Sequence, residues 1–452
     1  MQFENKDETM KKLILTLAIN LLLLSTNIAQ IPPEAFPLTN SLSDLWRNGE
    51  IDKATESSLE LYRLYPPMFI DRIHNTLAQQ LEDDSQQFGL KYLEQLLSKE
   101  NQEINEIIEP IYLWSKAIVA KEEQELTSIK QKLKKLQNDS SNYESKSERY
   151  SLLILMELDK KNATDNEYKA EIVNKNIRIL KTYPNIIQNV TDRKESEKRA
   201  WHRYLIAYCY DYLYSNVSNK EEYLKKASDY CPDLNDRLNS NAYFYDAALL
   251  TGNPRQIRYR SKYQKYLVDN NRKSEALNLL SETTFVEPSN YNVNSLKKLY
   301  KTTENDEPFN IYWESYIHNK GKTVPQIKIQ FEKEILDLTK KSGSWTYIDV
   351  WGTWCSPCRK ELPELQSLYS ENQQIENSKL KIYTFSFGSQ NLSDFMTENN
   401  YTFPVSEIDK LTNDLFEVSG YPTKILISPN GNFIKIPFGV DWKTYLKNYT
   451  LM

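Results

Sequence analysis

The sequence predicts a multidomain chain, in which an all-α region is followed by a smaller α/β domain. Only 10 of the 452 residues are glycine, whereas Lys, Glu, Leu and Tyr are frequent, and this composition favours helix over most of the length. Near the C-terminus the apolar pattern changes to short runs typical of strands, and a Cys-Ser-Pro-Cys motif joins such a run to a helix-like segment. We therefore expect a helical domain over residues 31–318 and an α/β domain over residues 319–452.

Apolar residues recur at helical spacing through the first domain, with polar breaks between the segments. The predicted helices are residues 45–65, 88–97, 107–136, 149–158, 170–182, 201–214, 221–230 and 274–283.

Proline follows several of these predicted helices, at Pro66, Pro184, Pro232 and Pro288. An alanine lies twelve residues before two of the prolines, at Ala54 and Ala276. This pattern resembles tetratricopeptide (TPR) repeats, but the prolines do not follow the repeat period of about 34 residues. We expect a divergent array of helical hairpins that binds a protein or peptide; a helical spacer without a ligand is the alternative.

The N-terminus has the features of a secretory signal peptide over residues 1–29. Lys11 and Lys12 precede an apolar run over residues 13–24, which is followed by small and polar residues. This run is too short to span a bilayer, and cleavage is expected near Ala29. We expect an exported, periplasmic protein that is soluble after cleavage; an uncleaved anchor is the alternative.

Charge excludes one class of partner. The formal net charge is -5, and the densest basic stretch, residues 130–135, alternates with Gln and Leu like a solvated helix face. Without a basic stripe, nucleic acid is not an expected partner.

The main chemical signal is the pair Cys355 and Cys358, between a strand-like segment at residues 345–350 and a helix-like segment at 359–370. Two cysteines three positions apart on a first helical turn can close a small disulfide ring. Unpaired N–H groups and the helix dipole stabilise a thiolate at the first position, which lowers a thiol pKa from about 8.5 to about 7. Cys355 is therefore the predicted nucleophile, and Cys358 the thiol that resolves a mixed disulfide.

A zinc site is the alternative for a CxxC pair, but it requires four ligands. The other candidates are Cys209, Cys231, His74, His202 and His318, which are scattered over the sequence. We expect no metal and no cofactor other than a redox-active disulfide. Cys209 and Cys231 lie on neighbouring predicted helices, where either a structural disulfide or two buried thiols are possible.

With these motifs, the last quarter of the chain resembles the thioredoxin superfamily, in its TlpA/ResA-like (AhpC/TSA-related) branch of extracytoplasmic thiol:disulfide oxidoreductases. Asp349 falls on the buried acid of the family, Pro363 on the proline that kinks the active-site helix, and Glu361 on an acid that follows CxxC in ResA-like members. Burial would raise the pKa of Asp349 and let it exchange a proton with Cys358. An exposed helix glutamate is the alternative for Glu361.

A second family signature lies downstream, at residues 420–423. The resemblance implies that Pro422 is cis and faces the disulfide, and that the backbone of Tyr421 binds the substrate chain. A trans turn proline is the alternative. We expect Trp354 to flank the thiols and Trp351 to pack in the core.

The remaining elements of the α/β domain follow from local patterns. We predict strands at residues 325–329 and 380–387, and helices at 332–341 and 392–399. Members of the branch usually carry a β-hairpin before the motif strand, where this sequence predicts one strand and one helix.

The resemblance implies an enzyme that exchanges electrons with protein disulfides, as a reductant supplied by a membrane thiol transporter, with the helical domain recruiting a partner. Peroxide reduction is disfavoured, because the Pro-x-x-x-Thr-x-x pattern of peroxiredoxins does not precede Cys355. The alternative is an interaction protein whose helical domain carries the function and whose thioredoxin-like domain is structural.

Overall fold

The computed structural model describes residues 32–451, apart from 83–85, 100, 137–140, 189, 191, 234–235, 238, 255–256 and 304–305. The chain forms two compact units, Met1–Lys262 and Tyr263–Met452. The predicted signal peptide, residues 1–29, lies outside the described residues. Within the described residues, none of the helices combines the length and apolar character that a bilayer crossing requires.

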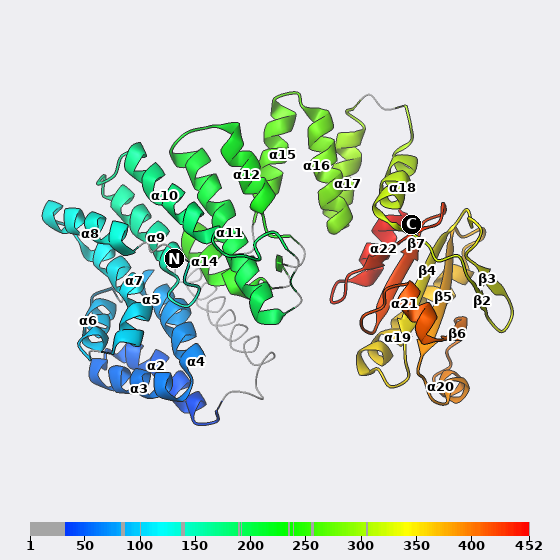
Figure 1. Cartoon of the computed structure of the whole chain (residues 1–452), viewed down its shortest axis with the longest axis horizontal. Coiled ribbons are helices and arrows are strands. Elements are labelled where there is room, and N and C mark those ends of the chain that lie inside the picture. The colour runs from blue at the N-terminus through cyan, green and yellow to red at the C-terminus, as the bar shows by residue number, and fades with distance from the viewer. Residues whose placement is uncertain are drawn as a thin grey trace, which may run out of the picture. The chain divides into compact units, whose positions relative to one another are not determined.

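The first unit is helical, as the sequence predicts (Figure 1). Its elements are α2 (Ala35–Asn48), α3 (Ile51–Leu64), α4 (Pro66–Asp71), the π-helical turn η2 (Arg72–Leu77), α5 (Ala78–Glu82), α6 (Gln86–Leu97), α7 (Gln102–Val119), α8 (Glu123–Leu136), α9 (Ser147–Lys160), α10 (Asn166–Leu180), α11 (Arg193–Asn216), α12 (Glu221–Tyr230) and α14 (Asn241–Thr251). The next helix, α15 (Tyr259–Asp269), spans the division between the units.

Two of the predicted long helices are wrong, because each is broken by a capped turn. Residues 45–65 form the end of α2 and all of α3, separated at Gly49, whose φ of 71° is the left-handed conformation that ends many helices. Residues 107–136 belong to α7 and α8, and the Glu125 carboxylate accepts the backbone N–H groups of Lys121 and Glu122 at the start of the second helix. Apolar periodicity continues across both breaks, so it did not reveal them.

The helices of the first unit pack around one apolar core, in which Ala54 is fully buried, as expected for a residue between paired helices. Pro66 begins α4 instead of only ending the helix before it. The helical prediction is thus confirmed, and the relation to TPR repeats stays a prediction.

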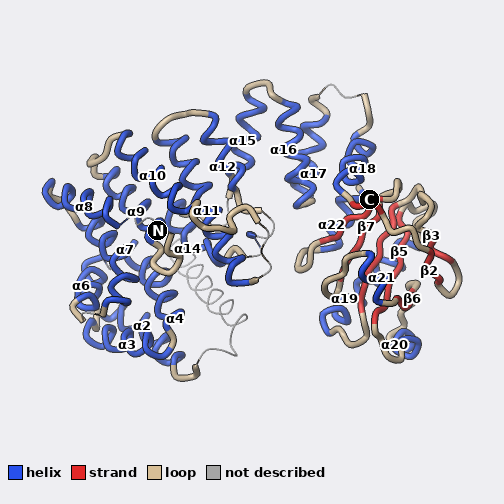
Figure 2. Tube along the Cα trace, viewed as in Figure 1, coloured by secondary structure: helices blue, strands red, loops and turns tan. Residues whose placement is uncertain are grey.

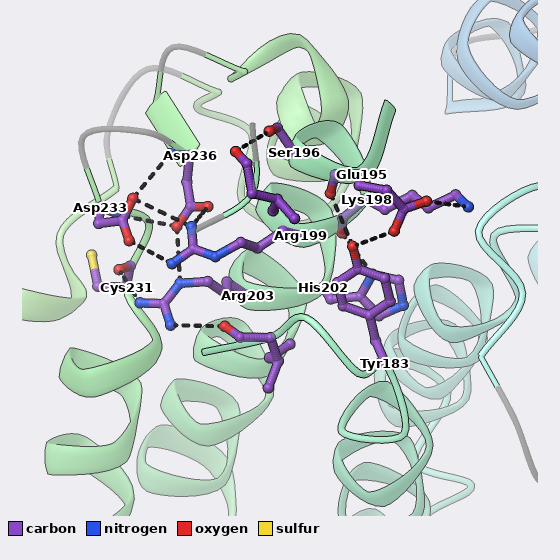
Figure 3. A network of polar contacts seen from close by, with 12 residues as sticks. Tyr183, Glu195, Ser196, Lys198, Arg199, His202, Arg203, Cys231, Asp233 and Asp236 are labelled. Atoms are coloured by element: carbon purple, nitrogen blue, oxygen red, sulfur yellow. Dashed lines mark hydrogen bonds and ion pairs between the residues drawn. The ribbon is translucent and has the colours of Figure 1, made fainter. Parts of the chain in front are cut away.

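A buried ionic network fixes the loop after α12 to α11 (Figure 3). Arg199 donates to Asp236 and, at 2.8 Å, to Asp233. Arg203 donates to the other oxygen of Asp236 at 2.9 Å and to the carbonyl oxygen of Cys231 at 3.3 Å. Since two cations face two carboxylates, the network balances its formal charge, as buried ionic groups require.

After the end of α15, the second unit continues with helices α16 (Lys273–Val286), α17 (Asn290–Tyr300) and α18 (Phe309–Lys320), followed by an α/β fold (Figure 2). Its strands are β1 (Lys322–Thr323), β2 (Lys328–Gln330), β3 (Ile335–Asp337), β4 (Trp345–Trp351), β5 (Leu380–Phe387), β6 (Val405–Ile408), β7 (Thr423–Ile427) and β8 (Asn432–Ile436). The helices between and after them are α19 (Ser356–Gln373), α20 (Leu392–Glu398), α21 (Lys410–Leu415) and α22 (Trp442–Thr450). The thioredoxin-like fold class is confirmed.

The main sheet has the strand order β1-β8-β7-β4-β5-β6. Strand β4 pairs in parallel with β5 and antiparallel with β7. All seven residues of β4 are buried, because the strand is central and both of its faces are covered. The strand that precedes the Cys-Ser-Pro-Cys motif is therefore the most enclosed strand of the sheet.

The helix predicted at residues 332–341 is wrong, because this segment contributes β3 to an antiparallel hairpin with β2. The turn closes where the N–H of Phe331 donates to the carbonyl of Glu334 at 2.8 Å. Phe331, Leu336 and Leu338 are buried in the core on one face of the sheet. Leu336 and Leu338 are two positions apart, which is the period of a strand, but this alternation is too short to have revealed the hairpin from the sequence. The hairpin that the branch usually carries is thus present.

The helices before the sheet are tied to the C-terminal helix. The buried indole of Trp313 in α18 donates to the carbonyl oxygen of Asn448 in α22 at 3.1 Å. The side chain of Asn448 donates to the carbonyl of Pro288 and to Oδ1 of Asn290, and the hydroxyl of Tyr449 donates to the carbonyl of Phe285. Residues 263–318 therefore belong to the second compact unit, and the domain boundary at 318/319 stays a prediction.

These contacts predict that Asn448→Ala destabilises the second unit. Both amide hydrogen bonds are lost and the carbonyl of Pro288 loses a buried partner, at a cost of about 1–3 kcal/mol. Urea unfolding of the full chain measures the change. Lys447→Ala, at an exposed position of the same helix, is the matched control, and an equal effect of both variants would contradict the assignment.

Candidate active site

The two cysteines of the motif form a disulfide at the start of α19, with their Cα atoms 5.3 Å apart. Cys355 is the N-cap residue of this helix, and its sulfur accepts the backbone N–H of Cys358 at 3.2 Å. The helix thus begins three residues earlier than the sequence pattern indicates. Because that N–H is one of the unpaired donors of the helix terminus, a thiolate at Cys355 would have a donor in place.

The turn between β4 and α19 requires a residue without a side chain. A Cβ on Gly352 would lie 2.6 Å from Nε1 of Trp354 and 2.9 Å from the carbonyl oxygen of Phe387. Pro357 lies in the first helical turn, where a missing N–H costs nothing. The local sequence therefore holds the disulfide at the end of the central strand.

An aromatic platform, formed by Trp354, Tyr421 and Phe387, connects the cysteine motif with the loop before β7. The side chain of Trp354 is 55% exposed, and its Nε1 donates to the carbonyl of Phe387 at 3.0 Å. The Tyr421 ring meets Trp354 edge to face at 5.2 Å and stacks on Phe387 at 5.8 Å. Trp351 is fully buried and contacts Phe395 of α20.

The loop before β7 lies beside the motif because of strand pairing. Thr423, the first residue of β7, is paired with Val350 near the end of β4. The Tyr421–Pro422 peptide bond is cis, the isomer that the resemblance implies, and the hydroxyl of Thr423 donates to the carbonyl of Gly420 at 2.7 Å. The cysteine motif and the loop at residues 420–423, although distant in sequence, thus meet at the same end of the two central strands β4 and β7.

Asp349 is buried in β4, with 2% of its surface exposed. Burial raises the pKa of its carboxyl group from 3.8 to about 6; the nearby Lys424 lowers this pKa and Glu361 raises it. None of the residues that the structure describes forms a hydrogen bond with its Oδ1 atom. This carboxyl group can therefore change its protonation state near neutral pH, as the sequence analysis expects for a proton carrier.

Lys424 is the charged residue of the site that sequence reasoning missed. It lies opposite Asp349 in the pairing of β4 with β7, is 5% exposed, and places Nζ 3.6 Å from Oδ2 of Asp349. Nζ also pairs with the carboxylate of Glu361 and lies 5.3 Å from the ring centre of Trp442. A lysine within the otherwise apolar run of β7 was the available signal. Glu361 is thus part of a three-residue ionic cluster with Asp349 and Lys424.

The other cysteines and histidines do not join this site. Cys209 and Cys231 are both buried free thiols, and burial raises the pKa of each. His74 is buried, and its Nδ1 lies 3.0 Å from the hydroxyl of Tyr150. His318 contacts Ser428 with Nδ1 at 3.0 Å. Among the residues that the structure describes, no group of three His, Cys, Asp or Glu side chains is arranged to hold a metal ion.

The raised pKa of Asp349 predicts a pH-dependent stability. The folded chain keeps this proton to about pH 6, whereas an unfolded carboxyl loses it near 3.8, so the stabilising contribution is complete below about pH 3.8 and is lost as the pH rises through about 6. The substitution Asp349→Asn removes this titration. The change that it causes in the free energy of unfolding should therefore be more favourable at pH 7 than at pH 4, by up to about 3 kcal/mol. Urea unfolding at both pH values measures this.

A matched carboxyl group serves as the control for that variant. Asp337 is only partly buried in the hairpin, and its pKa is lowered by the hydrogen bond from Thr339. Asp337→Asn should not stabilise the chain at pH 7. A gain for both variants would mean that general charge reduction, and not burial of Asp349, is responsible.

The contact at Gly352 predicts that Gly352→Ala disturbs the aromatic platform. The new methyl group would displace Trp354 and weaken its hydrogen bond to Phe387, at a cost of about 1–3 kcal/mol. Urea unfolding measures the loss of stability. The displacement of Trp354 is measured by its own fluorescence, which is the difference in emission between a chain with Trp354 and the same chain carrying Trp354→Phe. Gly420→Ala, where a Cβ meets nothing within 4 Å, is the control and should change neither.

Comparisons with known proteins place this site in a family. The family model described as "AhpC/TSA family" matches residues 321–436. The thiol-disulfide oxidoreductase ResA of Bacillus subtilis is 28% identical over 117 residues, which cover 25% of this chain and 64% of that protein. The sporulation thiol-disulfide oxidoreductase A of Bacillus subtilis is 30% identical over 138 residues, which cover 29% of this chain and 82% of that protein.

Among solved structures, StoA from Bacillus subtilis is 27% identical with a TM-score of 0.25, and the match covers 28% of this chain and 99% of that one. The matched regions cover less than a third of this chain and most of the length of the relatives. Through its C-terminal domain, the chain belongs to the ResA-like thiol-disulfide oxidoreductases of the thioredoxin superfamily.

Proposed function

We propose that this chain is an exported thiol-disulfide oxidoreductase that reduces protein disulfides through Cys355 and Cys358. The observation that carries the proposal is the position of Cys355 at the N-cap of α19, where the N–H of Cys358 donates to its sulfur. This donor and the helix dipole favour the thiolate, which is the nucleophile of disulfide exchange.

The proposed reaction begins with the reduced dithiol. The Cys355 thiolate attacks one sulfur of a substrate disulfide, a mixed disulfide forms, and the other substrate sulfur leaves as a thiolate. Cys358 then gives its proton to the Asp349 carboxylate and attacks the sulfur of Cys355. The second substrate thiolate leaves and the Cys355–Cys358 disulfide closes, so two electrons pass from the dithiol to the substrate.

The substrate chain would bind along the cis-proline loop. As the resemblance implies, Tyr421 would offer its backbone groups to the substrate chain, and Pro422, whose peptide bond with Tyr421 is cis, would face the disulfide. The exposed ring of Trp354 lies on the aromatic platform and provides an apolar surface next to the attacking sulfur. Glu361 would act on the site indirectly, through its ion pair with Lys424. These contacts support a protein or peptide disulfide as the substrate.

Export and the source of electrons complete the proposal. The basic and apolar N-terminal segment supports secretion to a periplasm-like compartment. Each turnover leaves the chain oxidised, so a reductant must restore the dithiol, and we propose a membrane thiol transporter for this role. The helical unit would recruit or orient a protein partner.

Cys358→Ala should trap substrates on Cys355, because the resolving thiol is lost while the attacking thiolate remains. The trapped mixed disulfides are identified by mass spectrometry after expression of the full chain in the native compartment. A Cys355→Ala/Cys358→Ala variant is the control and should trap nothing. If Cys358→Ala captures no disulfide-linked protein while the double variant still retains a partner without a covalent bond, the chain is instead an interaction protein with a structural thioredoxin-like domain.

A further inference from the structure

We propose that Ser389 is a positioning residue for Cys355: its hydroxyl group holds the turn that directs the attacking sulfur to the N-terminus of α19. The inference rests on the proposed function, in which Cys355 is the nucleophile. It starts from the contacts between the loop after β5, residues 388–391, and the residues just before the disulfide.

A tight turn connects β4 to α19. The N–H of Cys355 donates to the carbonyl oxygen of Gly352 at 3.0 Å, so Thr353 and Trp354 are the two central residues of the turn. The turn ends at Cys355, whose sulfur accepts the N–H of Cys358 at 3.2 Å. The orientation of this turn therefore decides whether the sulfur meets the free donors of the helix terminus.

The hydroxyl oxygen of Ser389 links this turn to the sheet. It accepts the backbone N–H of Thr353 at 2.9 Å and the hydroxyl of Ser386 at 2.6 Å. Ser386 is fully buried in β5, where it is paired with Trp351 of β4. Ser389 thus has an anchor in the same two strands that carry the turn.

The same segment also contacts the side chains of the turn. The hydroxyl of Thr353 donates to the carbonyl oxygen of Gln390 at 3.4 Å, and Nε1 of Trp354 donates to the carbonyl oxygen of Phe387 at 3.0 Å. Both of these bonds come from side chains, and the first is long. The bond to Ser389 comes from the backbone of the turn, so it restrains the turn directly.

The sulfur of Cys355 tolerates little misdirection. Only 4% of this residue is exposed, so a substrate can reach it from a narrow range of directions. In the reduced chain no covalent bond ties Cys355 to Cys358, and the hydrogen bonds of the turn then keep the sulfur beside the N–H of Cys358. Loss of this alignment would remove part of the hydrogen bonding that stabilises the thiolate.

The experiment measures the reactivity of Cys355 in the reduced full chain with iodoacetamide, from which the thiolate displaces iodide. Tandem mass spectrometry separates the product at Cys355 from those at Cys358, Cys209 and Cys231, and the rate is recorded as a function of pH. We expect Ser389→Ala to move the midpoint of the Cys355 profile upward by about half a pH unit, which makes the reaction below the midpoint about threefold slower. Ser389→Thr keeps the hydroxyl group and should retain the wild-type profile.

Ser393→Ala is the matched control, because Ser393 is an exposed serine in the neighbouring helix α20. This variant should leave the profile unchanged. The charged groups of the site, Asp349, Glu361 and Lys424, are the same in all of these variants, so a moved midpoint reports on the turn. A lower melting temperature of Ser389→Ala with an unchanged midpoint would mean that Ser389 is only structural, and would overturn the inference.

Hydrogen exchange of the wild-type chain tests the same bond without any variant. The amide of Thr353 should exchange slowly in the oxidised chain and remain protected after reduction, because its acceptor on Ser389 does not depend on the disulfide. Rapid exchange of this amide in the reduced chain would show that Ser389 does not hold the turn when Cys355 has to attack.

Failure of the proposed function is distinguishable from failure of this inference. If Ser389→Ala moves the alkylation profile but the reduced wild-type chain forms no mixed disulfide with glutathione disulfide, the proposed function fails while the positioning of Cys355 stands. If the wild-type chain exchanges disulfides and Ser389→Ala leaves the profile in place, only the inference fails.

Discussion

The register between β4 and β7 is the constraint on which the rest of the site depends. This single alignment pairs Val350 with Thr423 and Asp349 with Lys424. The first pair brings the cis-proline loop beside the cysteine motif, and the second buries a carboxyl group opposite a lysine. Because side chains alternate between the two faces of a strand, a slip of one residue would send Asp349 to the opposite apolar face. The apolar side chains of Ile348 and Val350 fix the register by packing on that face.

The ionic cluster behind the disulfide is costly to bury, and this cost is consistent with a role in proton transfer. Buried ion pairs contribute little net stability, since desolvation offsets their attraction. Here the compensation is also incomplete, because one lysine faces two carboxyl groups and, within the described part of the chain, one oxygen of Asp349 has no hydrogen-bond partner. By contrast, the Arg199 and Arg203 network of the helical unit balances two cations with two carboxylates. The first arrangement leaves a titratable group near neutral pH, whereas the second mainly fixes a loop.

The C-terminal helix joins two parts of the second unit that the sequence analysis assigned to different domains. In α22, the ring of Trp442 stacks on Tyr347 of the central strand. At the other end of this helix, Asn448 and Tyr449 form hydrogen bonds with the segment that contains helices α16, α17 and α18. The helix that covers the ionic cluster therefore also holds the preceding helices. The contacts of Asn448 and Tyr449 link residues more than a hundred positions apart, so local periodicity could not indicate them.

The sequence by itself determined the chemistry of the molecule and most of its elements. Two cysteines at a helix start, a carboxyl group in an apolar strand and a proline loop before another strand are local patterns, and their spacing is typical of the thioredoxin superfamily. Residues 380–387 and 221–230 were predicted with the bounds that the structure has, since strong alternation or helical spacing with clear ends marks both.

Only the tertiary structure decided how ambiguous segments fold and which charges meet. Strand β3 lies in a segment that was predicted as a helix, because the alternation of Leu336 and Leu338 covers only three residues, and pairing with β2 and packing against the sheet select the strand form. The partnership of Lys424 with Asp349 and Glu361 joins three elements, and nothing local to any one of them specifies the other two. Sequence patterns report which face of an element is apolar, whereas strand register and helix placement, set by the whole core, determine what each polar side chain contacts.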